Sequence, residues 1–343
     1  LTRYTGADRG GSDIGNWGAV VRLGDKLSEG DNGVFAFDKD AHTVQVHNGT
    51  RSELGSANAF AAYVLAFDLS KAYTERGSSA ALSFATPINA AASQKVTLTG
   101  DIDLTGTGIL GIGKDNSVSG QKFQGTLEGN KHRITLDIGT TYGAKVSGTE
   151  DNAAGQLYAK RSDQRDAHYS LALIPFAGDV TIQNLTIDGT IVCRVPQNVN
   201  EEEKSDDIRY PAFVSAAIGL ASGTTAFKNV TVNTKVSVAE EAVAAKKLHV
   251  WQAGFLGRCE GKKLTFQNCN WGSDSTLTDE RTTDNQSIGG LVAEVMGGCT
   301  VTVEDCTLSG SITSNSDSNA KAGGLIAVSR GKTQNGTTSA DTT

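Results

Sequence analysis

The sequence contains little proline and few aromatic residues: 4 Pro and 6% Phe, Trp and Tyr among 343 residues. The scarcity of proline and the lack of a Gly-X-Y period exclude collagen and proline-rich disorder, although 40 residues are glycine. Apolar residues make up 38% of the chain, which is enough material for a core. Because aromatics are few, we expect small aliphatic side chains to build it.

The chain also lacks long apolar runs and clustered basic residues. No stretch reaches the roughly 18 consecutive apolar residues of a transmembrane helix, so we expect no membrane insertion in this segment. The formal net charge is −7. Nucleic acid or an anionic membrane would require clustered Lys and Arg, so nucleic acid is not an expected partner.

Motifs for metals and cofactors are missing as well. The five cysteines form no CxxC pair, and the five histidines form no HExxH motif. The acidic pair Asp38 and Asp40 leaves calcium binding open, but no EF-hand loop is present. We therefore predict no metal site and no cofactor.

A repeat is present in the second half of the chain. Four segments share one pattern, in which Asn or Asp interrupts alternating apolar residues; they are Thr181–Ile187, Ala226–Val232, Thr265–Trp271 and Thr302–Leu308. The four polar positions are Asn184, Asn229, Asn268 and Asp305, spaced by 45, 39 and 37 in residue number. Upstream of them lies a second short apolar element, as in 216–219, 254–257, 290–293 and 324–327.

This pattern predicts short strands joined at a corner. In the first segment the apolar residues are Ile182, Leu185 and Ile187, which is strand alternation interrupted by one residue, Asn184. Asn and Asp tolerate left-handed backbone, so the four polar residues should form corners whose side chains bond as a ladder. Stacking the repeats about 4.8 Å apart then buries a continuous core. We predict an all-β fold, a right-handed parallel β-helix (β-solenoid).

The expected organisation has four parts. Residues 1–55 form an N-terminal leader or strand region, 56–95 a capping helix and linker, 96–331 the parallel β-helix, and 332–343 a flexible tail. The helix is predicted from Ser56 as N-cap and from the apolar face of Phe60, Val64 and Phe67. Because the chain begins at Leu1 and has no leader sequence, we expect an excised or mature region.

Insertions between repeats give the sharpest functional prediction. A bare coil needs about 20 residues, and the surplus always falls between the last strand of one repeat and the next Gly-rich strand. These long loops should therefore emerge on one side and form a binding face. The candidate contact residues are Asp206, Asp207, Arg209, Tyr210, His249 and Trp251. Trp271 has the register of a core residue instead.

Catalytic residues are not predicted. The candidate carboxylate pairs of a glycosidase are Asp101 with Asp103, Asp206 with Asp207, and Glu304 with Asp305. The first pair alternates with apolar residues on the outer face of a strand, the second belongs to a polar loop, and the third is tied to a corner. None accompanies a motif typical of β-helix polysaccharide enzymes.

The cysteines are expected to be mostly free thiols. Cys269 and Cys306 occupy one repeat position, and stacked side chains about 4.8 Å apart are slightly too distant for a disulfide. Cys259 and Cys299 lie in corresponding turns and are the better candidates for a pair.

The repeat resembles the GLUG-type repeats of bacterial surface proteins. The resemblance covers residues 96–328 and rests on Gly290-Leu291-Val292-Ala293, Gly324-Leu325-Ile326-Ala327, Gly254-Phe255-Leu256-Gly257 and the segment from Phe123 to Ile134. It implies an extracellular cell-surface or cell-wall location and an adhesin-like role, in which the loop face contacts a glycan or protein of a host or neighbouring cell. Two alternatives stay open: a β-helix polysaccharide hydrolase or lyase, and a structural spacer or fibre subunit with end-to-end self-association.

Overall fold

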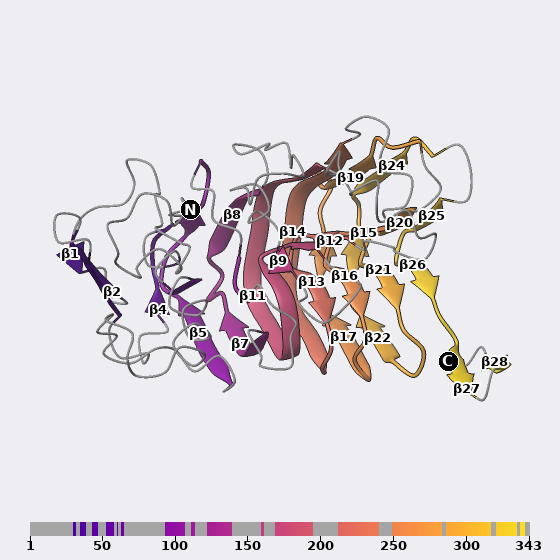
Figure 1. Ribbon diagram of the computed structural model, residues 1–343, viewed down its shortest axis with the longest axis horizontal. Helices are drawn as coiled ribbons and strands as arrows, with labels where there is room; N and C mark the ends of the chain where they lie inside the picture. The colour runs from indigo at the N-terminus through magenta and orange to yellow at the C-terminus, as the bar shows by residue number, and fades with distance from the viewer. Residues whose placement is uncertain are drawn as a thin grey trace, which may run out of the picture.

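The computed structural model of the chain describes residues 30–31, 35–38, 43–46, 53–57, 60, 63–64, 93–106, 111–113, 122–138, 159–160, 169–194, 212–239, 249–282, 286–316, 320–334 and 337–339. These residues form an all-β structure in which strands of successive repeats lie side by side (Figure 1). None of the helices in this part of the chain has the length and apolar character needed to cross a membrane.

Most strands belong to one curled sheet of parallel neighbours. Its strands are β4 (Glu53–Leu54), β5 (Gln94–Leu98), β6 (Ile102–Asp103), β7 (Phe123–Glu128), β8 (Arg133–Ile138), β11 (Ile174–Arg194), β13 (Ile218–Ala221), β14 (Thr225–Ala239), β16 (Leu256–Cys259), β17 (Lys263–Gln267), β18 (Asn270–Trp271), β19 (Thr276–Asp279), β21 (Val292–Val295), β22 (Thr300–Glu304), β23 (Thr307–Leu308), β24 (Ser311–Ser314) and β26 (Ile326–Ser329).

Smaller sheets complete the fold. A six-stranded sheet contains β9 (Ala159–Lys160), β10 (Tyr169–Leu171), β12 (Ala212–Ser215), β15 (Val250–Ala253), β20 (Gln286–Gly289) and β25 (Lys321–Gly323). All its neighbours are parallel except β9 and β10. Near the N-terminus, β1 (Gly30–Asp31), β2 (Phe35–Asp38) and β3 (Thr43–Val46) are antiparallel. Within the predicted tail, β27 (Lys332–Gln334) and β28 (Thr337–Ser339) form a hairpin.

The repeats stack in register, because each strand pairs with the equivalent strand of the next repeat. Ile182 lies beside Phe227, which lies beside Phe266, which lies beside Val303. Every second side chain of β14 is buried on each side of its corner, as strand alternation requires. The rings of Phe227 and Phe266 stack with centroids 5.0 Å apart, so the core is continuous between these repeats.

Trp271 lies in this core, as its register predicts, with 2% of its surface exposed. Its indole packs against a glycine, which has no side chain to occupy this space: a Cβ on Gly310 would lie 2.5 Å from Trp271 Cε2. Gly125 has a related role, since its φ is +113° and an added Cβ would lie 2.0 Å from the Gln94 carbonyl oxygen. Glycine is therefore required where the backbone or a large ring from a neighbouring strand approaches closely.

The corners between strands have left-handed backbone. Asn184, Asn229, Asn268 and Asp305 have φ values of 53°, 53°, 52° and 51°. The Asn229 Nδ2 donates to Asn184 Oδ1 over 2.9 Å, and the Asn184 Nδ2 donates to Glu128 Oε1 over 3.0 Å. Burial raises the pKa of Glu128, but hydrogen bonds from the Asn130 amide and from the Asn184 and Gln183 side chains outweigh it, so the pKa lies below its usual value. A carboxylate thus ends this row of amides.

The predicted helix at 56–75 lies mostly outside the described residues. Of its described part, the Phe60 amide donates to the Ser56 carbonyl over 3.0 Å. Phe60, Tyr63 and Val64 are at most 2% exposed and belong to the core cluster that contains Leu54. These side chains pack in one cluster with Leu54 of β4, while the capping helix stays a prediction.

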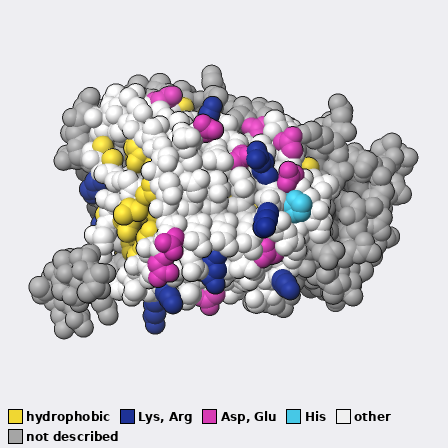
Figure 2. All heavy atoms as spheres, turned by 180° about the vertical axis from the view of Figure 1, so that it is seen from behind, with side chains coloured by type: hydrophobic (Ala, Val, Ile, Leu, Met, Phe, Trp, Pro, Cys, Tyr) yellow, Lys and Arg dark blue, Asp and Glu magenta, His cyan; other side chains and the backbone are white. Residues whose placement is uncertain are grey.

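The C-terminal end of the stack is open. Leu325 and Val303 are 48% and 39% exposed, although equivalent residues in earlier repeats are buried. Figure 2 shows hydrophobic side chains gathered near this end of the molecule. The last repeat therefore lacks a neighbour to cover its apolar side chains within the described structure.

The corners give a first prediction. We expect Asn229→Ala to lower the free energy of unfolding by about 2 kcal/mol, because alanine disfavours left-handed backbone and the bond to Asn184 is lost. Asn229→Gly tolerates the φ value and should cost only about 1 kcal/mol, the worth of the hydrogen bond. Urea denaturation of the three proteins checks this. Equal losses in the two variants would contradict the role of backbone conformation.

Candidate functional site

Residues between repeats leave the stack at one edge. The strands that precede them end at Arg194, Ala239, Asp279 and Ser314, and these ends are aligned across neighbouring strands. The strands that follow, β12, β15, β20 and β25, are likewise aligned. We name this side of the stack, defined by those strand ends and by the described residues beside them, the loop edge.

Stacked rings lie beside the loop edge at the start of β15. The rings of His249 and Trp251 are 4.0 Å apart and nearly parallel, and Trp251 also stacks on Phe213, 5.1 Å away. Trp251 is only 6% exposed and His249 9% exposed. These two predicted contact residues therefore pack mainly against the protein, and Trp251 joins a small apolar cluster between β12, β15 and the strands that follow them.

A buried carboxylate lies below these rings. Glu294 in β21 is fully buried and lies between Arg258 of the preceding repeat and Arg330 of the following one. The Arg258 Nε lies 3.1 Å from Glu294 Oε2, an ion pair whose N–H is not aligned for a hydrogen bond. Arg258 also lies over the Trp251 ring, 5.3 Å from its centroid. Because a buried charge is costly unless paired, this column fixes the register of three repeats.

A second buried ion pair closes the segment after β19. Arg281 and Asp279 are both fully buried. The Arg281 Nε donates to Asp279 Oδ1 over 2.9 Å, and its second guanidinium nitrogen donates to Oδ2 over 2.7 Å, so the contact is bidentate. The charges neutralise each other and hold the chain where it turns away from the stack.

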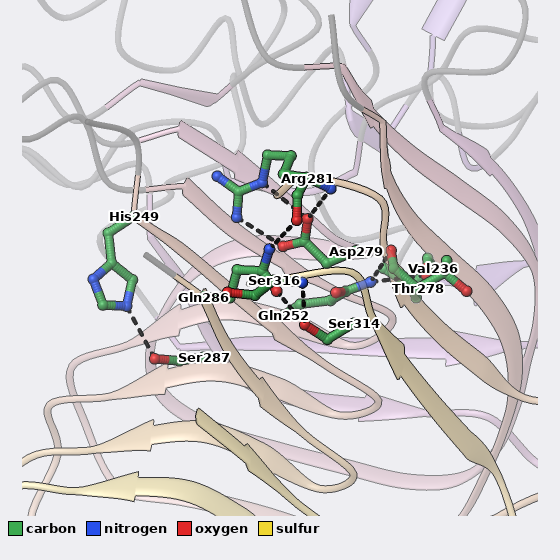
Figure 3. A network of polar contacts seen from close by, with 10 residues as sticks. All are labelled: Val236, His249, Gln252, Thr278, Asp279, Arg281, Gln286, Ser287, Ser314 and Ser316. Atoms are coloured by element: carbon green, nitrogen blue, oxygen red, sulfur yellow. Dashed lines mark hydrogen bonds and ion pairs between the residues drawn. The ribbon is translucent and has the colours of Figure 1, made fainter. Parts of the chain in front are cut away.

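Side-chain amides extend this contact across the loop edge (Figure 3). The Gln286 Nε2 donates to the Arg281 carbonyl over 2.6 Å, and the Ser314 hydroxyl donates to Gln286 Oε1 over 2.6 Å. Gln252 Nε2 donates to the Val236 carbonyl over 2.8 Å. The network therefore links the ends of strands from three repeats at the bases of the loops.

The predicted contact residues are only partly placed. Asp206, Asp207, Arg209 and Tyr210 lie outside the described residues, so their role stays a prediction. The buried charges of the loop edge were not predicted from the sequence. A signal existed for one pair, because Arg258 and Glu294 occupy equivalent positions of successive repeats, where earlier repeats have Phe176 and Leu220.

The candidate catalytic pairs have structural surroundings. Asp101 accepts from the Arg133 amide over 2.9 Å, which lowers its pKa, whereas a general acid requires a raised one. Asp103 accepts from the Thr105 amide over 2.9 Å in a turn. Asp305 is a corner residue with φ of 51°. These contacts supply structural roles for Asp101, Asp103 and Asp305.

His249 also approaches a hydroxyl, since its Nε2 lies 2.9 Å from Ser287 Oγ. A nucleophilic serine must be reached by a substrate, but Ser287 is fully buried. The contact therefore serves packing. Among the described residues, no group of three or more His, Cys, Asp and Glu side chains is arranged to hold a metal ion.

The buried ion pair gives a second prediction. We expect Arg281→Ala to destabilise the protein by about 3–5 kcal/mol, because Asp279 would be left buried and unpaired. The matched control is His132→Ala at the His132–Asp101 contact, where the Asp101 side chain is 69% exposed and stays in water, so the loss should stay within about 1 kcal/mol. Chemical denaturation measures both. Similar losses would show that burial does not decide the effect.

Comparison with known proteins leaves the family unassigned. No protein-family model, no curated protein and no solved structure matches the chain. The functional conclusion therefore rests on the residues and on the geometry of the loop edge.

Proposed function

We propose that the repeats form a right-handed parallel β-helix that serves as an adhesin-like binding module of an extracellular surface protein. The in-register parallel strands support the β-helix, and crossovers between parallel strands are almost always right-handed. The resemblance to GLUG-type repeats supports the surface role. The contact partner is a glycan or protein of a host or neighbouring cell.

The observation that carries the proposal is the common edge at which the inter-repeat segments leave the stack. Aligned strand ends bracket residues 195–211, 240–248 and 283–285 on the same side. Per-repeat insertions that share one side of a solenoid commonly form its binding surface. The buried ion pairs and amides at their bases provide a rigid platform for such loops.

The charge pattern agrees with this type of partner. On the face drawn in Figure 2, Lys and Arg side chains alternate with Asp and Glu and do not gather in a patch of one sign. This described face therefore offers no basic patch to a polyanion, while the loops that would contact the partner lie outside the described residues.

The third prediction tests the loops. We expect a variant with residues 195–211 and 240–248 replaced by short Gly/Ser linkers to lose binding on a glycan array and to cells, relative to the full chain. The matched control is Lys262→Ala with Lys263→Ala, two exposed side chains at another turn of the repeat, which should bind normally. Unchanged binding by the folded loop variant would reject the loop edge as the contact surface.

A structural spacer or fibre subunit is the second candidate, and the open C-terminal end favours it. Leu54 of β4, near the N-terminal end of the curled sheet, is buried, whereas Leu325 and Val303 at the other end are exposed. The occupant that fits is the same end of a second copy, whose edge strands and apolar side chains would complete both stacks; this contact closes as a dimer, so it supports a two-copy spacer and not a fibre.

The fourth prediction separates this candidate from a monomeric module. We expect the molar mass from light scattering to double with rising protein concentration, and Leu325→Glu to keep the protein monomeric. Lys262→Glu, an exposed position two repeats inward from Leu325, is the control that should still associate. A monomer at all concentrations would exclude this role for the open end.

A further inference from the structure

Two cysteine side chains from successive repeats meet outside the loop edge. Cys259 ends β16, and Cys299 lies in the turn between β21 and β22. Their sulfur atoms are 3.6 Å apart, although the residues are 40 apart in sequence. We propose that Cys259 and Cys299 are a redox-active dithiol that closes to a disulfide and links two repeats covalently.

Backbone hydrogen bonds hold the two residues opposite each other. The Met296 amide donates to the Cys259 carbonyl over 2.9 Å, and the Thr300 amide donates to the Lys262 carbonyl over 2.9 Å. The turn between them therefore has its two ends fixed on the preceding repeat. A disulfide needs a sulfur–sulfur distance of about 2.05 Å, so rotation of the Cys299 side chain must close the remaining gap.

The two thiols differ in accessibility. Cys259 is fully buried in the core cluster, while Cys299 is half-buried and packs at the edge of that cluster. An external oxidant can therefore reach Cys299 first. This arrangement assigns Cys299 as the attacking residue and Cys259 as the resolving residue.

The contact between the sulfur atoms also shifts the pKa values of the two thiols in opposite directions. The hydrogen bond from Cys259 lowers the pKa of Cys299 despite the opposing effect of its burial. The same hydrogen bond, followed by burial, raises the pKa of Cys259. The thiolate is the reactive form of cysteine, so the accessible residue is also the one whose ionised form is stabilised.

The reaction proceeds by thiol–disulfide exchange with a small-molecule disulfide. The Cys299 thiolate attacks one sulfur of the reagent, which forms a mixed disulfide and releases one reagent thiol. The Cys259 thiol then loses its proton and displaces the second reagent thiol, so the Cys259–Cys299 bond forms. The two protein thiols together lose two electrons and two protons. The reagent disulfide takes up these electrons and protons and becomes two thiols.

Cys269 and Cys306 also meet across successive repeats, but there the Cys269 amide donates to the Cys306 sulfur over 3.4 Å, and both thiols bond to backbone carbonyls. Cys269 donates to the Gln267 carbonyl over 3.4 Å, and Cys306 donates to the Glu304 carbonyl over 3.2 Å. Burial is the main cause that raises the pKa of Cys269 to about 11 and that of Cys193 to about 12. These three residues provide internal controls for the pair.

The test treats the reduced full chain with oxidised glutathione. We expect two of the 5 thiols to be lost and a peptide map to contain one Cys259–Cys299 link. The temperature of unfolding should rise by roughly 5 °C or more, because the bond closes a loop of 40 residues. Cys269→Ser with Cys306→Ser should leave all three results unchanged.

Two single variants distinguish the assigned roles. Cys259→Ala should retain a glutathione adduct on Cys299, because the resolving thiol is missing. Cys299→Ser, a change at a half-buried turn that the fold tolerates, should form neither adduct nor link. Five free thiols after treatment, a link through Cys269 or Cys306, or an adduct on Cys259 in the Cys299→Ser variant would overturn the proposal.

Discussion

Parallel, in-register pairing between successive repeats is the constraint on which the rest of the structure depends. It places each residue beside its equivalent in the next repeat. Equivalent side chains therefore form columns along the stack and stabilise one another by contacts within each column. Phenylalanines stack in the core, amides bond along a corner, and opposite charges pair between Arg258 and Glu294. A substitution in one repeat therefore changes the environment of two others.

The corners and core could be predicted because their signals are local and repeated. Asn184, Asn229, Asn268 and Asp305 interrupt strand alternation at one point of the pattern, and their residue types are those that tolerate the left-handed backbone observed there. The burial of Trp271 followed from its register with Ile187 and Val232 in the same way. A single short strand pattern does not show which residues lie beside each other, whereas the alignment of the repeated segments does.

The buried charges were not predicted, because charged residues in a strand are usually exposed to solvent. In the sequence, Arg258 and Glu294 resemble solvated positions of an exposed strand face. They are buried because a second layer of strands covers this side of the curled sheet, and the sequence indicates that layer through Phe176 and Leu220 at the equivalent positions of earlier repeats. Asp279 and Arg281 have the spacing that places two side chains on one face of a strand, but β19 ends at Asp279, so strand alternation does not extend to Arg281 and does not predict their bidentate contact. The predicted contact residues Asp206, Asp207, Arg209 and Tyr210 belong to an insertion that does not follow the repeat pattern. Alignment of the repeats therefore does not predict where they lie.

The layer between the two sheets also gives the stack a direction. Its paired positions are apolar at Phe213 and Leu220, become aromatic and basic at Trp251 and Arg258, and then small and acidic at Ser287 and Glu294. Arg258 links the aromatic and the acidic positions of this layer, because it contacts the Trp251 ring on one side and the Glu294 carboxylate on the other. Separating the two repeats would take Arg258 away from Glu294, at the cost of an unpaired buried group. The repeats are therefore alike in backbone but not interchangeable, because this layer requires Arg258 and Glu294 in successive repeats.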